Sequence, residues 1–187
     1  MPRKAEITRE AMVQAAVALV REEGVERLNA RALASRLGCS TQPILYQFGS
    51  MQELRRETYA AADALHDARI TEDVEAAESP LMQLGLNYVR FAYEEPRLFR
   101  FLFQTDAFGG QDLTSLVAAP DVSELVALVA QTAGMDESQA RRVFLVIFVA
   151  AHGYASLLDN NALTYDEVQV AGVLDAAYTG ALQREGW

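Results

Sequence analysis

The chain has 187 residues, 51% of them apolar, and a formal net charge of −10 at pH 7, which predicts a globular protein of one domain or two small ones. Its single cysteine, Cys39, excludes an internal disulfide and a metal site built from several cysteines. The longest strongly apolar run, Val143 to Ala151, is far shorter than the roughly 20 residues that a membrane span needs, and residues 1–4 lead into no signal-peptide core. We therefore expect a cytoplasmic protein with no membrane partner.

The charge is unevenly distributed along the chain. Residues 1–56 carry nine Lys or Arg against six Glu, a net charge of +3, whereas the remainder carries seven Arg against twenty Asp or Glu, a net charge of −13. A basic N-terminal part on an acidic remainder suits a protein that approaches phosphates only with its N-terminal end. An ordinary solvated surface is the alternative, because +3 over 56 residues is modest.

The first predicted helix begins after Thr8 and ends before Gly24, and two short helices follow it. Asn29 can cap the first of these, residues 30–37, and Gly38 ends it. The second, residues 41–48, has Pro43 in its first turn, where a missing backbone N–H costs nothing. Two short helices joined by a three-residue turn predict a helix-turn-helix.

The second short helix has one inward and one outward face. Ile44 and Phe48 point inward together. The outward side chains have hydroxyl or amide groups that can meet base edges and phosphates, and they are Thr41, Gln42, Tyr46 and Gln47. The alternative is a helical hairpin whose polar residues merely face water. Cys39 in the turn is interpreted as a small buried hydrophobe, with a redox-sensor role as the alternative.

The rest of the chain predicts six further helices and no strand of any length. Ser50 to Glu53 form a capping box for a long helix whose later, polar part, residues 67–78, is a connector. Pro80 begins the next helix, and a short aromatic-rich helix follows over residues 97–104. Helices over residues 121–134 and from residue 136 come next, and Thr164 to Glu167 form a capping box for the last one.

The last two predicted helices point to a partner chain. Residues 143–151 are apolar on nearly every side of their helix, so one face is expected inward and the other against a second copy. We predict Val149 in that contact. The final helix has small residues at a spacing of four, Gly172, Ala176 and Gly180, which let another helix come close. Alternatively, these glycines pack against the preceding helix of the same chain.

Catalytic and metal-binding chemistry find little support. His66 and His152 lie on different predicted helices, without an H-x-x-x-H or Glu-x-x-His pattern, so we expect no metal site and no cofactor. No carboxylate, lysine or cysteine accompanies His152 at helical spacing, so we expect no enzyme. His152 is interpreted as a core residue with one hydrogen bond, or else as a ligand contact.

The first 55 residues resemble the TetR family of transcriptional regulators. The matching positions are Ala15, Ala16, Leu19, Gly24, Asn29, Arg31, Leu33, Ala34, Leu37, Gly38, Ser40, Ile44, Phe48, Ser50 and Leu54. Further along, residues 95–99 and His152-Gly153 look like features that recur in the family's sensor domains. The resemblance implies an all-α protein, with a three-helix DNA-binding domain over residues 1–56 and a ligand-sensing, dimerising domain over residues 57–187.

The sequence also departs from the family pattern in the DNA-binding part. Leu45 stands where a Tyr usually contacts a phosphate, Gln47 where His or Tyr is common, and Met51 where Lys is usual. Asn29 replaces a Thr and keeps a capping group. The residues expected at the DNA are Arg27, Asn29, Arg31, Thr41, Gln42, Pro43, Tyr46 and Gln47.

The resemblance implies a dimeric repressor that binds a pseudo-palindromic operator in double-stranded DNA and is released by a small apolar or aromatic effector. The aromatic residues of the sensor part can line an effector pocket or simply fill a core. Those predicted at the effector are Tyr88, Phe91, Phe103, Phe144, Phe148 and His152. The alternative function is a helical protein-interaction module with a degenerate DNA-binding domain.

Overall fold

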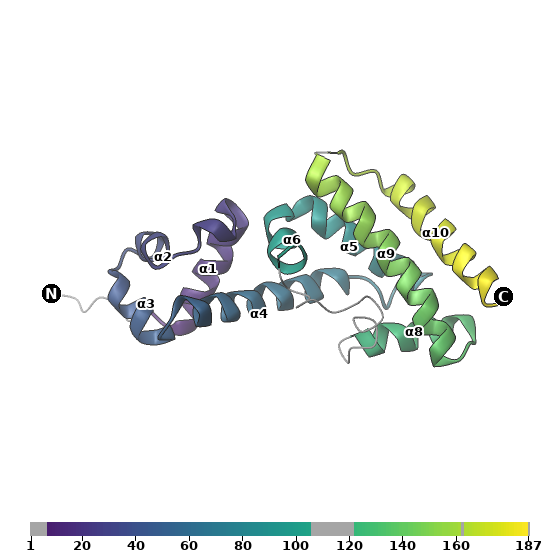
Figure 1. Cartoon of the computed structure of the whole chain (residues 1–187), viewed down its shortest axis with the longest axis horizontal. Helices are drawn as coiled ribbons and strands as arrows, with labels where there is room; N and C mark the ends of the chain where they lie inside the picture. The colour runs from purple at the N-terminus through teal and green to yellow at the C-terminus, as the bar shows by residue number, and fades with distance from the viewer. Residues whose placement is uncertain (1–6, 106–121, 162, 187) are drawn as a thin grey trace. The chain divides into compact units, whose positions relative to one another are not determined.

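The computed structural model describes residues 7–105, 122–161 and 163–186, and all regular structure within them is helical (Figure 1). The prediction of an all-α fold is confirmed. The described elements are α1 (Arg9–Glu23), the 3₁₀ helix η1 (Val25–Arg27), α2 (Ala30–Leu37), α3 (Thr41–Phe48), α4 (Met51–Ile70), α5 (Pro80–Glu94), α6 (Pro96–Phe103), α8 (Ser123–Ala133), α9 (Glu137–Asn161) and α10 (Glu167–Arg184).

The chain forms two compact units. The first comprises Met1–Asp67 and Glu95–Ala107, and the second comprises Ala68–Glu94 and Phe108–Trp187. The first unit therefore holds α1, α2, α3, most of α4 and α6, and the second holds α5, α8, α9 and α10. The predicted domain boundary after residue 56 falls within α4 and stays a prediction.

Local capping explains where several helices begin and end. Thr8 Oγ1 accepts a hydrogen bond from the Ala11 N–H at 3.1 Å, and Gly38 ends α2 with a left-handed φ of 62°. Asp136 caps α9 in a reciprocal box with Gln139. The predicted cap of the last helix at Thr164 is wrong. Asp166 is the N-cap of α10, and its Oδ1 accepts from the Gln169 N–H, because a carboxylate there reaches the first turn.

The core of the first unit holds α3 in place. Leu33 of α2, Ile44 and Phe48 of α3 and Leu54 of α4 are all nearly inaccessible to solvent. In addition, α6 packs against α1 and contributes a buried face to this unit. Burial of these side chains stabilises the unit because it removes apolar surface from water.

In the second unit, α9 packs against α5, α8 and α10 (Figure 1). Val143, Phe144 and Ile147 of α9 join one hydrophobic cluster with α8, and Ala151 and Leu158 join another with α5 and α10. Also, α5 and α10 approach closely. A Cβ added to Gly85 would lie 2.8 Å from a methyl carbon of Leu174.

The sequence predicted that no segment is long and apolar enough to span a membrane, and the structure corrects this expectation. Among the described residues, α9 alone passes that test, with 25 residues and a mean hydropathy of 1.5 over its most apolar window. The apolar run of residues 143–151 understated this because α9 continues well beyond it. The core helix of a soluble protein passes the same test, and α9 packs against three helices of its own unit.

Asn87 joins α5 to the backbone around the end of α4. Its side chain is buried, and its Nδ2 donates to the carbonyls of Ile70 at 3.0 Å and Glu72 at 2.8 Å. Its Oδ1 accepts from Gln83 Nε2 at 2.9 Å. This buried amide therefore satisfies two carbonyls that leave a helix end.

We predict that Asn87→Ala lowers the free energy of unfolding by about 1–3 kcal/mol, because the carbonyls of Ile70 and Glu72 lose their hydrogen-bond donor. Asn87→Asp should cost at least as much, since a carboxylate keeps the Gln83 contact but cannot donate. Gln83→Ala is the control and should cost less, about 0.5–1.5 kcal/mol. Urea titration measures all three, and equal losses for Asn87→Asp and Gln83→Ala would contradict this role.

Candidate nucleic-acid interface

The outer face of α3 is open to solvent. Gln42, Pro43, Leu45 and Tyr46 are exposed, Tyr46 to 87%, while Thr41 and Gln47 are partly exposed. Ile44 and Phe48 occupy the opposite, buried face. The structure thus brings the predicted α3 residues together on one surface, as their spacing predicted. It also adds Leu45, which the sequence reasoning treated only as a lost tyrosine.

Arg9 fixes the C-terminal end of α3. Its Nη1 donates to the Gln47 carbonyl, and its guanidinium lies 4.4 Å from the centre of the Phe48 ring. The same guanidinium forms a bidentate ion pair with Glu57 of α4, in which Nε donates to Oε2 at 3.0 Å. One side chain of α1 therefore joins α3 to α4.

Asn29 has a structural task that its sequence position predicted only in part. Its Oδ1 accepts from the N–H groups of Arg31 and Ala32, and its Nδ2 donates to the Arg27 carbonyl. The amide therefore caps α2 and holds the backbone before it. These hydrogen bonds fix the N-terminal end of α2, where Arg31 lies. Direct contact of Asn29 with DNA stays a prediction.

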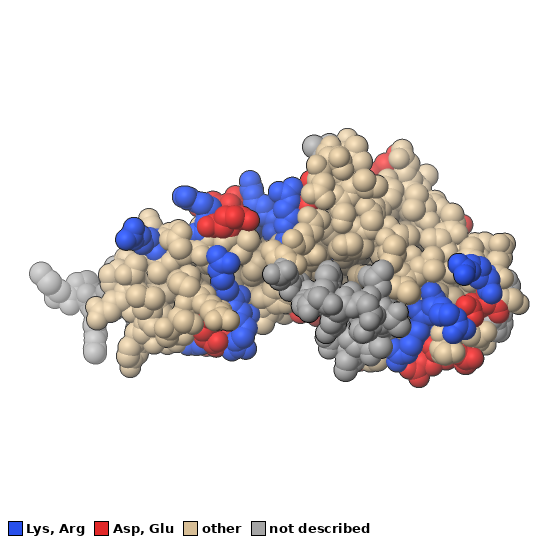
Figure 2. Space-filling view, viewed as in Figure 1, with Lys and Arg blue, Asp and Glu red and all other residues tan. Residues whose placement is uncertain are grey.

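Most guanidinium groups of the first unit already have acidic partners. Figure 2 shows blue patches over this unit, several of them beside red ones. The exposed pairs are Arg27 with Glu23, Arg36 with Glu22 and Arg56 with Glu53. Such surface pairs contribute little and exchange readily, so Arg27 can still turn toward a phosphate.

Arg31 and Arg55 differ from these residues. Both are exposed, and in the described part of the chain neither guanidinium takes part in an ion pair. Arg31 begins α2 and Arg55 lies in the second turn of α4. Sequence reasoning missed Arg55, although its position four residues beyond Met51, the site of a usual lysine, was an available signal.

Five of the six predicted effector residues belong to the second unit. Tyr88, Phe148 and His152 are in ring contact, with centroid separations of 5.7 to 6.4 Å, and Phe144 stacks on Phe148. Phe91 is buried on α5. Phe103, however, belongs to the first unit and packs against His66 with ring centroids 4.9 Å apart. A role of Phe103 at the effector stays a prediction.

His152 has a hydrogen bond within the second unit. Burial raises the pKa of Tyr88 far above its ordinary value, so its phenol stays protonated and forms a hydrogen bond with His152 Nδ1, 2.9 Å away. Burial also lowers the pKa of His152, which favours a neutral ring. The core interpretation of His152 is therefore supported, and a role in ligand contact stays a prediction.

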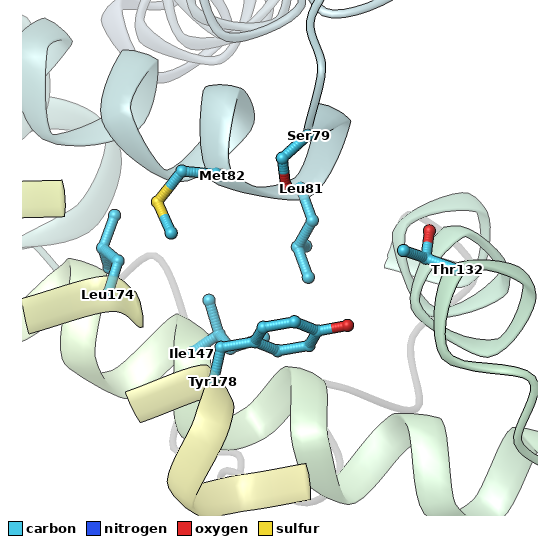
Figure 3. Close-up of a pocket in the computed structure, with 7 residues that line it drawn as sticks. All are labelled: Ser79, Leu81, Met82, Thr132, Ile147, Leu174 and Tyr178. Carbon is cyan, nitrogen blue, oxygen red and sulfur yellow. The ribbon is translucent and has the colours of Figure 1, made fainter. Parts of the chain in front are cut away.

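A narrow cleft lies in the second unit (Figure 3). Its free volume is about 20 Å³, which is room for one water molecule. None of the predicted effector residues lines it. Its lining residues are Ser79, Leu81, Met82, Thr132, Ile147, Leu174 and Tyr178.

The predicted dimer residues lie on an open surface. Val149 is 46% exposed, and Gly172, Ala176 and Gly180 are exposed on α10. A Cβ added to either glycine would meet no atom within 4 Å. The alternative, that these glycines pack against the preceding helix of the same chain, is therefore wrong.

Asp63, His66 and Asp67 are the described residues that could hold a metal ion. Their potential ligand atoms lie within 4.8 Å of one another on α4. The sequence reasoning tested spacings of His with His or Glu and missed this Asp-x-x-His pattern. Burial lowers the pKa of His66, whereas Asp67 opposes the shift. All three groups come from consecutive turns of one helix, and the site offers no described ligand from a second element.

Helix α3 is short, follows a turn after α2, and exposes a polar face while its apolar face is buried. This arrangement is that of a helix-turn-helix DNA-binding protein. Residues 12–58 match the model described as bacterial regulatory proteins of the tetR family, and residues 81–179 match the model described as tetracyclin repressor-like, C-terminal domain. The chain belongs to the TetR family of transcriptional regulators. It is also similar to an uncharacterized HTH-type transcriptional regulator of Mycobacterium tuberculosis, Rv0681, with 24% identity over 190 residues that cover 96% of this chain and 78% of the relative.

We predict that Arg9→Ala lowers both the midpoint of thermal unfolding and the affinity for every DNA sequence, because α3 loses its link to α4. Arg36→Ala is the matched control, since Arg36 also forms a bidentate pair, with Glu22, but does not contact α3. Circular dichroism and DNA titration measure the two effects. Similar losses for the two variants would show that Arg9 contributes only as a surface ion pair.

Proposed function

We propose that this transcriptional regulator is a ligand-responsive repressor that binds a pseudo-palindromic operator as a dimer, with one α3 helix in each half-site. The single observation that carries the DNA-binding part is the exposed polar face of α3, together with two exposed arginines, Arg31 on α2 and Arg55 on α4. Hydroxyl and amide groups on such a helix contact base edges in the major groove, while arginines beside it contact phosphates.

The alternative function is a helical protein-interaction module with a degenerate DNA-binding domain. Titrating DNA duplexes at low and at moderate salt separates the two, because a regulator shows sequence-dependent affinity above a salt-sensitive background. A module of the second kind would show only the background. The two exposed arginines favour the regulator, since they partly replace the charge of the missing lysine.

Sequence recognition and phosphate contact should respond differently to substitution. Gln42→Ala should cost about 1–3 kcal/mol on the preferred operator and relax the choice of base there. Arg31→Ala and Arg55→Ala should weaken all sequences alike, and each should lower the salt slope by about one. Fluorescence anisotropy across several duplexes and salt concentrations provides the measurement. Indistinguishable profiles for Gln42→Ala and Arg31→Ala would refute the assignment.

The proposed dimer uses the open faces of α9 and α10. Apolar side chains are exposed on both helices, with Val146, Val149 and Leu157 on α9 and Val168 and Val173 on α10. Gly172, Ala176 and Gly180 are exposed on α10, and the two glycines leave room for a second helix backbone. At roughly 25 cal/mol per Å², an interface of about 800 Å² per partner gives gross stabilisation large enough to offset association entropy.

We predict that the double variant Gly172→Leu, Gly180→Leu is a folded monomer. Both added side chains point into open space in the single chain, so the fold has no reason to suffer, whereas a partner helix would be forced away. Ala127→Leu, another exposed helical position in the second unit, is the control. Analytical ultracentrifugation at low micromolar concentration should show a monomer only for the double variant. A double variant that stays dimeric would place the close contact elsewhere.

The proposed effector is a small apolar or aromatic molecule that binds among the aromatic residues of the second unit. The support is the contiguous group formed by Tyr88, Phe144, Phe148 and His152. Such an effector releases DNA only if its affinity differs between the operator-bound and free conformations. Native mass spectrometry of the purified protein would identify a candidate. Operator DNA must then weaken its binding, and an unchanged affinity would disprove the coupling.

A further inference from the structure

We infer that α3 recognises neighbouring A·T base pairs, with the Gln42 amide on an adenine and the Leu45 side chain on the methyl group of a thymine. This inference rests on the proposed function, because it assigns the base chemistry of the same helix. It names the class of operator that the chain selects. It also gives Leu45 a task in base recognition.

The absence of charge on α3 limits the bases that it can recognise. Residues 41–48 contain no acidic and no basic side chain. Guanine is most often recognised through O6 and N7 by the paired donors of Arg or by Lys, and the amino group of cytosine by a carboxylate. The groups available on α3 are amides, hydroxyls and apolar side chains, which suit adenine N6 and N7 and the thymine methyl group.

Gln42 and Leu45 lie three residues apart on α3, so their side chains are neighbours along one face of the helix. Gln42 and Leu45 are both exposed, whereas Ile44 and Phe48 occupy the buried face. Three residues along a helix rise about 4.5 Å, which is close to the roughly 3.4 Å between stacked base pairs. A helix lying in the major groove can therefore present the amide to one pair and the leucine to the next.

A single exposed leucine needs no explanation in general, but Leu45 lies where it can contact a base in the major groove. Leu45 is 47% exposed, one turn beyond Gln42 on the face that meets DNA. It has no polar atom for a phosphate, so it gains from DNA only by covering apolar surface. The thymine methyl is the apolar group that the major groove offers. Burying one methyl group corresponds to about fourfold in affinity.

The test uses full-length protein and duplexes selected by it from a random library. Each thymine of a selected duplex is replaced in turn by deoxyuridine, which removes the methyl group and keeps the base-pairing edge. We expect about a fourfold loss of affinity at one thymine per half-site. Leu45→Met should keep this loss. Leu45→Asn, of similar size but polar, should bind more weakly and no longer distinguish thymine from uracil at that position.

Three results would overturn the inference. They are a scan in which no thymine matters, a Leu45→Asn variant that keeps the full loss at the same thymine, and selected half-sites that are mainly G·C where Gln42→Ala relaxes the choice. Because Leu45 is half exposed, its variants should keep the circular dichroism spectrum and unfolding midpoint of the original chain. A selection that enriches no sequence at all is a different outcome, and it would refute the proposed function itself.

Discussion

The orientation of the recognition helix depends on Arg9. Helix α3 has only eight residues and buries two side chains, Ile44 and Phe48, which is too little to fix its direction alone. Arg9 adds a hydrogen bond to the last turn of α3, a contact with the Phe48 ring and a bidentate pair with Glu57. Because base contacts depend on helix orientation, Arg9, which is distant in sequence from α3, controls whether the exposed face of α3 can contact bases.

The charged side chains of the first unit are mostly paired with one another. Acidic partners neutralise most of its arginines, and α3 itself carries no charged side chain, so the groups that α3 offers to a base are amides, hydroxyls and apolar side chains. Arg31 on α2 and Arg55 on α4 are the exposed arginines that we propose as phosphate contacts. In the second unit, α9 combines two demands, since its inner face builds the core while Val146, Val149 and Leu157 remain exposed. This combination accounts for the high hydropathy of α9.

Features encoded locally were predictable from sequence, whereas long-range pairings were not. Thr8, Asn29 and Gly38 mark helix ends because capping depends on neighbouring residues, and the structure confirms all three. The Arg9–Glu57 pair joins residues 48 positions apart, and no periodicity announces it. The ring contact of Phe103 with His66 also joins two helices, α6 and α4, and no helical periodicity announces it. The exposure of Arg55 and Leu45 likewise required the three-dimensional arrangement of α3 and α4.

Hydrogen–deuterium exchange of the full chain, with and without a selected operator duplex, tests the central claim most directly. If α3 and its supporting residues form the DNA interface, exchange must slow in peptides that cover α2, α3 and the first turns of α4. Random duplex at the same salt concentration should produce a weaker effect in the same peptides. Protection confined to the second unit, or equal protection by selected and random duplexes, would contradict a sequence-specific regulator that reads DNA with α3.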